Sequence, residues 1–187
     1  MMSVFNHVSI DGFFAGPNGE LDWFYSLPHD EEWYEYTHSQ AGTSNTLVFG
    51  RTTFDMMKSF WPTDEAIKLD PVMADSVNNS PKIVFSKTLK SATEESVWKN
   101  ITIYSEINPD EIIQLKKKSE ITILSSGSIV QQFTNFKLID EYFLVIVPVI
   151  LGKGKSFFNN VKRTDLNLIE SKKFNNGIVL LHYKKKS

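Results

Sequence analysis

The stretch that decides the fold is Thr46-Leu47-Val48-Phe49-Gly50-Arg51-Thr52-Thr53-Phe54-Asp55-Met56-Met57-Lys58. Its first four residues form a short apolar run that favours a β-strand, and a helical pattern begins directly after Gly50. A strand that runs through one glycine into a helix brings free backbone N–H groups close to an anion. Arg51 adds a permanent cation, and Thr52 and Thr53 add hydroxyls to the first helical turn. The stretch therefore predicts either a phosphate-binding turn or an ordinary strand-to-helix connection.

The rest of the chain alternates apolar strands with helical segments. A strand at 121–124 runs through Ser126-Gly127-Ser128 into a helix that ends near 136, which repeats the pattern at Gly50. We expect other strands at 2–10, 82–85, 101–104, 142–150 and 177–184, and other helices at 28–40, 51–60, 71–77 and 109–118. This alternation predicts an α/β fold with a mixed, mainly parallel sheet and helices on both faces. The last two strands have no helix between them, and we expect them to pair antiparallel at one edge.

Composition limits the classes of protein that remain. The 187 residues fit a single domain, 1–187, and a formal net charge of −2 gives no reason to expect nucleic acid as a partner. The absence of cysteine excludes disulfides, zinc–thiolate sites and a cysteine nucleophile, and the four histidines show no metal-ligand spacing. The N-terminus lacks the features of a signal peptide, and no stretch is long enough to span a membrane. We therefore expect a cytoplasmic protein with no metal site and no membrane partner.

Three predicted strands end in small polar residues: Gly50–Thr53, Ser86–Thr88 and Ser126–Ile129. Because ligands of open α/β sheets bind at the carboxyl ends of the strands, these segments share one predicted binding edge. Two of the three begin helices, and Arg51 and Lys87 add positive charge. This set suits a ligand with several phosphates, such as a phosphorylated dinucleotide. The alternative is that small polar residues commonly end strands.

The segment Val149-Ile150-Leu151-Gly152-Lys153-Gly154-Lys155-Ser156 ends like a phosphate-binding P-loop. The position of the first glycine in that motif is Val149, and residues 157–160 are a poor start for a helix. We interpret the segment as a turn after a strand.

A longer set of motifs, in order along the chain, resembles the dihydrofolate reductase-like superfamily. The similarity is greatest to the reductase domain of riboflavin biosynthesis and to its stand-alone bacterial relatives. The residues that carry it are 9–16 (Ser-Ile-Asp-Gly-Phe-Phe-Ala-Gly), 48–54, 83–88, 126–128, Asp140-Glu141, 147–152 and 177–181. The resemblance covers nearly the whole chain.

The resemblance implies a sheet flanked by helices, with NADPH across its carboxyl edge. By position, Gly50, Arg51, Thr52 and Thr53 would meet the cofactor phosphates. Ser86 and Lys87 would lie near the phosphate on the adenosine ribose. The pyrophosphate would contact Ser126, Gly127, Ser128 and Ile129, through an unusual peptide at Ser126–Gly127. The long loop after Asp11, with Phe13, Phe14, Trp23 and Phe24, would cover the nicotinamide.

Two departures concern the substrate. Riboflavin-pathway reductases tend to have lysine or arginine where this chain has Phe13, and Glu-Gly-Gly where it has Ser125-Ser126-Gly127. Dihydrofolate reductases have an acidic residue on the first helix that anchors the pterin, a place open here to Asp30, Glu31 or Glu32. Our candidates on the substrate side are Asp11, Asp22, Trp23 and Glu31.

The leading hypothesis is a reductase that uses NADPH to pass hydride to a small pyrimidine- or pteridine-like molecule. Such a substrate is 5-amino-6-(5-phosphoribosylamino)uracil or dihydrofolate. The alternative is a non-catalytic NADP(H)-binding sensor or scaffold module, suggested by Phe13 and Ser125 at positions where reductases carry other residues. The motifs at Arg51 and Lys87 contain no acidic residue that would repel a ribose phosphate, which favours NADPH over NADH.

We also expect a homodimer. The apolar strand at 142–150 is predicted near the edge of the sheet, and exposed edges of this kind are normally covered. Relatives of the riboflavin type pair through this region. The alternative is that the segment after Gly152 folds back over the edge.

Overall fold

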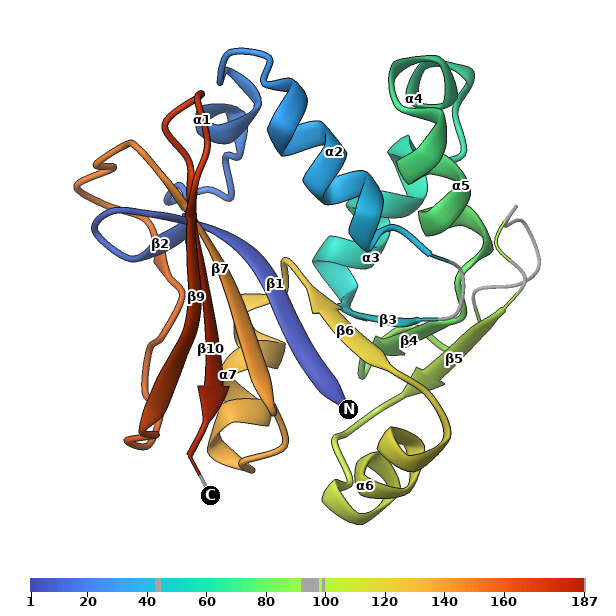
Figure 1. The fold of residues 1–187 in the computed structure, drawn as a ribbon. Coiled ribbons are helices and arrows are strands. Elements are labelled where there is room, and N and C mark those ends of the chain that lie inside the picture. The colour runs from blue at the N-terminus through green and yellow to red at the C-terminus, as the bar shows by residue number, and fades with distance from the viewer. Residues whose placement is uncertain (43–44, 92–97, 99, 187) are drawn as a thin grey trace.

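The computed structural model describes residues 1–42, 45–91, 98 and 100–186. Within them, one eight-stranded sheet has the order β5-β4-β3-β6-β1-β7-β10-β9, and β2 (Phe13–Ala15) pairs with β8 (Lys155–Ser156) beside it (Figure 1). The strands of the large sheet are β1 (Met2–Ser9), β3 (Thr46–Gly50), β4 (Lys82–Phe85), β5 (Ile101–Tyr104), β6 (Ile121–Leu124), β7 (Glu141–Val147), β9 (Leu166–Lys173) and β10 (Val179–Lys185). The pairings from β5 through β7 are parallel, and β10 is antiparallel to both β7 and β9. The predicted mixed, mainly parallel sheet with antiparallel C-terminal strands is confirmed.

Helices cover both faces of the sheet. Figure 1 shows α2 (Glu31–Gln40), α3 (Arg51–Phe60), α4 (Asp64–Leu69) and α5 (Pro71–Asn79) on one side, and α6 (Pro109–Lys118) and α7 (Gly127–Asn135) on the other. The buried side chains agree with this division. Phe54 of α3 and Val77 of α5 pack in one cluster, whereas Ile112 of α6 and Phe133 of α7 pack in another. A short α1 (Asp22–Tyr25) lies in the loop after β2.

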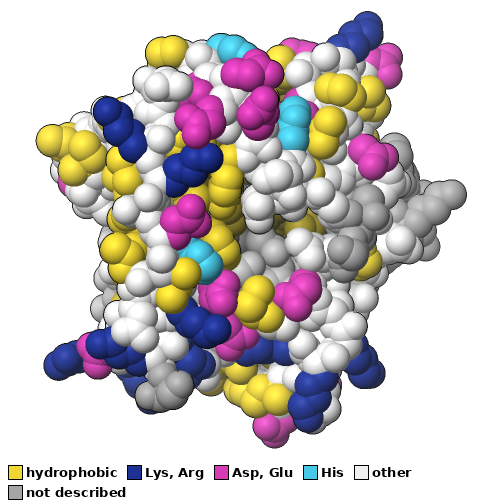
Figure 2. All heavy atoms as spheres, in the orientation of Figure 1, with side chains coloured by type: hydrophobic (Ala, Val, Ile, Leu, Met, Phe, Trp, Pro, Cys, Tyr) yellow, Lys and Arg dark blue, Asp and Glu magenta, His cyan; other side chains and the backbone are white. Residues whose placement is uncertain are grey.

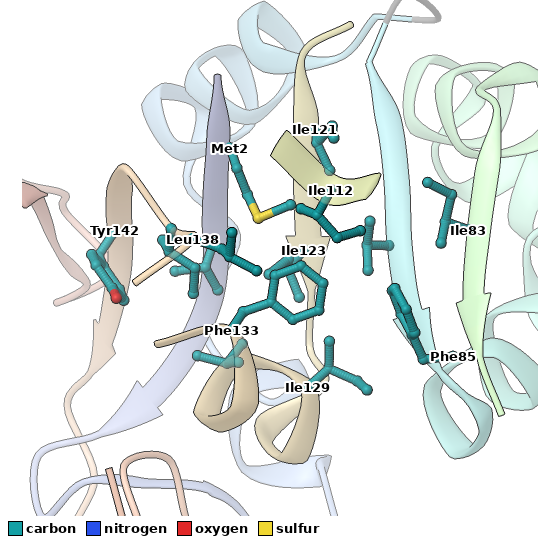
Figure 3. Close-up of a cluster of buried hydrophobic side chains, with 14 of the residues drawn as sticks. Met2, Ile83, Phe85, Ile112, Ile121, Ile123, Ile129, Phe133, Leu138 and Tyr142 are labelled. Atoms are coloured by element: carbon teal, nitrogen blue, oxygen red, sulfur yellow. The ribbon is translucent and has the colours of Figure 1, made fainter. Parts of the chain in front are cut away.

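The largest core lies between the sheet and the second pair of helices. In Figure 3, Ile112 from α6 and Phe133 from α7 meet Met2, Ile121 and Ile123 from the central strands. These five side chains are at most 2% exposed. Burial of apolar area on this scale holds the two central strands and α7 in a fixed relation. The core therefore holds α7 against β1 and β6, the strands beside the predicted binding edge.

Most predicted elements occur within a few residues of their expected bounds, and the differences have local causes. The strand expected at 142–150 ends at Val147, because Pro148 has no N–H to donate to a strand ladder. The helix expected from residue 28 begins at Glu31, since the Asp30 carboxylate accepts from the backbone N–H groups of Glu32 and Trp33 and acts as the N-cap. The sequence reading missed β2, α1, α4, β8 and β9.

The position expected for β7 is wrong. β7 lies between β1 and β10, so the edge of the sheet is β9, a strand that sequence analysis did not predict. The strand beside β7 is β10, as expected, and β9, which lies in the segment between Gly152 and β10, covers β10. The homodimer stays a prediction without its original support. Sedimentation velocity at micromolar concentration tests it directly, and a single monomer boundary would contradict it.

The surface gives no strong charge pattern on the face that Figure 2 shows, where positive and negative side chains are interspersed over the described residues. This agrees with the formal net charge of −2. Among the described residues, none of the helices combines the length and the apolar content that crossing a lipid bilayer requires.

Candidate active site

The connections of the sheet open a crevice between β3 and β6. The chain leaves β3 through α3 towards β4, whereas it leaves β6 through α7 on the opposite face and passes β1 to reach β7. The two crossovers therefore diverge at neighbouring carboxyl ends, which is where ligands of such sheets bind. A cavity of about 310 Å³ lies there. Its helix side consists of Gly50, Arg51, Thr52, Thr53, Met56, Ser125, Ser126, Gly127 and Ser128, and its loop side of Asn6, His7, Phe14, Ala15, Gly19, Leu21, Phe24 and Lys155.

The two helices that begin at this cavity have no side-chain caps. The N-cap residues of α3 and α7 are Gly50 and Ser126, and neither accepts a bond from its own helix through a side chain. Neither helix carries an acidic residue in its first turn. Free N–H groups and a partial positive charge thus remain at both N-termini. Two such N-termini on one cavity form a site suited to a multiply charged anion.

A chain of hydrogen bonds joins these two N-termini. The Gly50 N–H donates to the Ser126 hydroxyl at 2.8 Å, the Ser126 hydroxyl donates to Thr53 Oγ1 at 2.9 Å, and Thr53 Oγ1 donates to the Ser125 carbonyl at 2.9 Å. Thr53 and Ser126 are 7% and 5% exposed. Their hydroxyls are consequently engaged with each other, and both residues position the turns. The resemblance had implied direct contact of these residues with phosphates, which stays a prediction.

The turn before α7 has an unusual backbone. Ser125 has φ of 49°, in the left-handed region that residues other than glycine rarely occupy. The unusual peptide expected at Ser126–Gly127 is not found, because all peptide bonds of the described residues are trans. Gly127 has a steric role of its own, because a Cβ there would overlap the Cε1 atom of the Phe14 ring. The Phe14 ring therefore packs directly on the start of α7.

Arg51 lies on the cavity wall and already has a partner. Its Nε donates to the Asp55 carboxylate at 2.6 Å, across one helical turn, and both side chains are about half exposed. Asp55 is an acidic residue beside the Arg51 motif that sequence analysis had not weighed. A ligand phosphate would compete with this exposed ion pair, which is of a kind worth roughly 0–1 kcal/mol.

Ser86 and Lys87 lie at the end of β4, beside β3, but do not line the cavity. The Ser86 hydroxyl accepts from the backbone N–H groups of Thr88 and Leu89, which ends the strand in a turn. Lys87 is exposed. The Ile129 side chain is buried in the core and packs against Gly50, so only its backbone is placed to serve a ligand.

Asp11 holds two turns together outside the cavity. Its carboxylate accepts from the Ser9 hydroxyl at 2.7 Å and from the backbone N–H groups of Leu151 and Gly152 at 3.1 and 2.7 Å. The Ser9 bond, with help from those two N–H groups, holds the pKa of Asp11 below its ordinary value. The segment at 149–156, excluded above as a P-loop, is therefore fastened to the turn after β1.

The other substrate-side candidates also lie outside the cavity wall. Asp22 begins α1, the Trp23 indole donates to the Glu20 carbonyl, and Glu31 is exposed and paired with His29. The buried Asp30 is engaged with the start of α2 and with the Asn176 N–H at 2.8 Å. Glu32 pairs with Lys172 at the surface.

The loop side contains residues that sequence analysis missed. β1 continues past the end of β6, since its last pairing with that strand is Phe5↔Leu124. Asn6 and His7 lie in this unpaired part of β1 and line the cavity. The sequence feature that could have indicated these two residues is the polar pair Asn6-His7 within a largely apolar strand. Phe14 and Phe24 of the long loop line the cavity, and the expectation that this loop covers a nicotinamide stays a prediction.

His7 forms part of an aromatic wall. Its ring stacks on Phe24 with 4.5 Å between centroids and 8° between planes, and it meets Trp33 edge-on. Burial lowers the pKa of His7 to about 4, because an apolar environment disfavours the charged imidazolium. The ring is therefore neutral at pH 7 and presents a flat, weakly polar surface.

Known proteins resemble this chain in sequence and in architecture. The Uncharacterized protein YyaP of Bacillus subtilis (strain 168) is 31% identical over 179 residues, covering 94% of this chain and 90% of that protein. A "Putative riboflavin biosynthesis protein" from Shewanella sp. PV-4 has a TM-score of 0.76 at 24% identity, covering 100% of this chain and 99% of that one. Dihydrofolate reductase from Enterococcus faecalis, complexed with NADP(H) and RAB-propyl, has a TM-score of 0.59 at 16% identity, covering 100% and 97%.

These structural similarities establish the dihydrofolate reductase-like fold that the sequence motifs predicted. The family model of the RibD C-terminal domain matches residues 2–180. The match runs through every strand of the sheet and both uncapped helices, ending inside β10. The chain belongs to the RibD C-terminal domain family, a reductase-like family.

Proposed function

We propose that this protein is an NADPH-dependent reductase that passes hydride to a small pyrimidine- or pteridine-like molecule. The observation that carries the proposal is the convergence of two uncapped helix N-termini, α3 and α7, on one cavity at the carboxyl ends of β3 and β6. The backbone N–H groups of both first turns would hold the cofactor phosphates. The cofactor, when bound, supplies the hydride, and the protein supplies position and exclusion of water.

Arg51 is the residue best placed to distinguish NADPH from NADH. It is on the cavity wall, its guanidinium is always charged, and its fork of donors suits a phosphate. Its pairing with Asp55 is exposed and weak enough for a ribose phosphate to displace. Lys87 lies outside the cavity on the neighbouring strand end, so its contribution is expected to be smaller.

The loop side of the cavity supports reduction over simple cofactor binding. A sensor or scaffold module needs only the helix side, whereas a reductase also needs space for a second molecule. Asn6, His7, Phe14 and Phe24 provide a wall of flat rings and one amide there. Phe14 and Phe24 would exclude water from the site of hydride transfer.

The cofactor proposal predicts a preference that depends on Arg51. Wild-type protein is expected to bind NADPH about a hundredfold more tightly than NADH, from charge-assisted contacts worth roughly 1.5–3 kcal/mol each. Arg51→Ala should weaken NADPH about tenfold and leave NADH nearly unchanged, and Lys87→Ala should act likewise but less. Fluorescence titration of both cofactors measures this.

Arg163→Ala is the matched control, because Arg163 is also an exposed arginine paired with a nearby carboxylate, Asp165, and does not line the cavity. It should leave both affinities unchanged. Equal affinity of the wild-type protein for NADH and NADPH would contradict the assigned cofactor.

The substrate is tested by turnover. Loss of NADPH absorbance is followed with 5-amino-6-(5-phosphoribosylamino)uracil and, separately, with dihydrofolate. Turnover of either identifies the branch of the superfamily to which the activity belongs. Tight NADPH binding with no turnover of either would remove both named activities and leave other pyrimidines and pterins to be assayed.

A further inference from the structure

The charged residues on the cavity wall are both cations. Arg51 lies on the helix side and Lys155, from β8, on the loop side, and none of the described residues that line the cavity is acidic. Arg51 is paired with Asp55. By contrast, no hydrogen bond or ion pair of the described residues engages the Lys155 ammonium group. The loop side therefore carries a positive charge that the described part of the chain does not neutralise.

The pairing of β8 with β2 directs Lys155 towards the cavity. Lys155 lies opposite Ala15 in this two-stranded ribbon, and residues directly opposite each other share one face. Both residues line the cavity, as does Gly19, where a Cβ would lie 3.3 Å from Lys155 Nζ. Glu20, the acid next to Gly19, is occupied, because its carboxylate accepts from the backbone N–H and the side-chain amide of Asn18. The Lys155 side chain is exposed, and its charge lies on the cavity side of the ribbon.

The ribbon of β2 and β8 is attached to α7. Gln131 Nε2, in the second turn of α7, donates to the carbonyls of Ser156 and Phe157 at 3.1 Å each. The Phe14 ring, from β2, packs on the start of the same helix. Lys155 directly precedes Ser156, so these contacts hold its backbone beside the uncapped end of α7.

The location of this charge indicates which part of a dinucleotide it meets. A phosphorylated dinucleotide carries a pyrophosphate between its two nucleosides and a separate phosphate on the adenosine ribose. Arg51, at the start of α3, is the residue proposed above to meet the ribose phosphate. Lys155 lies on the loop side, where the nicotinamide is expected, and the pyrophosphate is the anionic group that adjoins the nicotinamide nucleoside. A lysine ammonium is a compact charge that can pair with either of its phosphates.

We propose that Lys155 is a cofactor-binding residue that contacts the pyrophosphate of the dinucleotide from the loop side, opposite the backbone N–H groups at the start of α7. This inference rests on the proposed function, because it treats the cavity as a dinucleotide site. NADPH and NADH share the pyrophosphate. Lys155 therefore contributes equally to the binding of both cofactors, whereas Arg51 distinguishes them.

The test is a substitution that removes the charge and keeps the length of the side chain. Lys155→Met should weaken NADPH and NADH about tenfold each, the effect of one charge-assisted contact, and leave the ratio of the two affinities unchanged. Lys155→Arg keeps the charge and should stay within about threefold of wild type. Fluorescence titration of the full-length proteins measures these affinities. A loss confined to NADPH, or no loss for either cofactor, overturns the proposal.

Ionic strength separates a charge contact from a structural effect of the substitution. The Debye length falls from about 10 Å at 0.1 M salt to about 3 Å at 1 M, and Lys155 is exposed to the solvent. The difference between wild type and Lys155→Met should therefore shrink to about twofold at 1 M salt. A difference that is the same at low and high salt shows that the methionine disturbs the ribbon, and overturns the contact.

Lys153→Met is the matched control, because Lys153 is an exposed lysine of the same turn and does not line the cavity. It should leave both affinities unchanged. A loss equal to that of Lys155→Met would show a general effect of net charge and overturn the proposal.

The wild-type protein tests the proposed function separately. Equal wild-type affinities for NADPH and NADH contradict the assigned cofactor, whereas an equal loss of both in Lys155→Met still supports the pyrophosphate contact. Inorganic pyrophosphate is the probe that needs no dinucleotide, and calorimetry should show that it binds wild type about tenfold more tightly than Lys155→Met. Equal binding of pyrophosphate by the two proteins overturns the role of Lys155.

Discussion

Two sets of helices in this protein begin in opposite ways. At α2, α5 and α6, the side chains of Asp30, Asp70 and Asn108 accept hydrogen bonds from the first-turn N–H groups. At α3 and α7, Gly50 and Ser126 provide no such bond. Among the described helices of eight or more residues, the uncapped pair is the pair that borders the cavity.

The first-turn backbone N–H groups therefore have two different roles in this fold. Where a helix begins away from the cavity, a side chain satisfies the free N–H groups and the helix gains stability. Where α3 and α7 begin, those groups are left for a ligand, and the Ser126 hydroxyl is used to join the two turns instead. Stability is thus given up at the positions where binding is proposed.

The largest expected effect comes from giving α3 a cap. Gly50→Asp would place a carboxylate at the N-cap, where it satisfies the first-turn N–H groups and repels an anion. NADPH affinity should fall about a hundredfold while the free energy of unfolding is unchanged or rises. Fluorescence titration and urea denaturation measure the two quantities.

Gly50→Ala is the control for the added Cβ, which would lie 3.1 Å from Cγ1 of Ile129. Its loss of affinity should stay below about tenfold. If Ala and Asp reduce NADPH binding equally, crowding and not the carboxylate is responsible, and the N-terminus of α3 does not hold an anion.

A smaller effect is expected from separating the two uncapped helices. Thr53→Val keeps the shape of the side chain but leaves the Ser125 carbonyl without its donor and the Ser126 hydroxyl without its acceptor. The free energy of unfolding should fall by about 1–3 kcal/mol, and NADPH affinity by roughly tenfold as the turns lose their relative position.

Thr37→Val is the comparison, because the Thr37 hydroxyl donates only within α2, to the Tyr34 carbonyl. It should leave NADPH affinity unchanged. A Thr53→Val protein that loses stability but binds NADPH normally would show that the bridge between α3 and α7 is structural alone.

The smallest effect on binding is expected at a capped helix. Asp70→Ala removes the bond to the Met73 N–H and the pairing with His38, and should lower the free energy of unfolding by about 1–2 kcal/mol. NADPH affinity should stay within about twofold of wild type, since α5 does not border the cavity. Loss of affinity matching that of Thr53→Val would remove the distinction between the two sets of helices.

Local patterns explain what sequence analysis predicted well. The runs at β3 and β6 are apolar, short and ended by small residues, so their bounds follow from neighbouring residues alone. β9 was missed because it is an edge strand whose side chains are largely exposed, and its pairing depends on β10. The ion pair between Arg51 and Asp55 could have been predicted from their spacing of four residues on one helix, but sequence analysis did not consider it.

The sequence by itself determined the alternation of the central strands and helices, the mainly parallel sheet, and the strand ends at Gly50 and Ser126 that border one edge. These follow from local propensity and from the rule that crossovers return strands in the same direction. Only the tertiary structure decided that Thr53 would bond to Ser125 and Ser126, that Asp11 would hold Gly152, and that Asn6 would reach the cavity. The physical reason is that partners more than 70 residues apart meet according to the order of strands in the sheet, which no local pattern encodes.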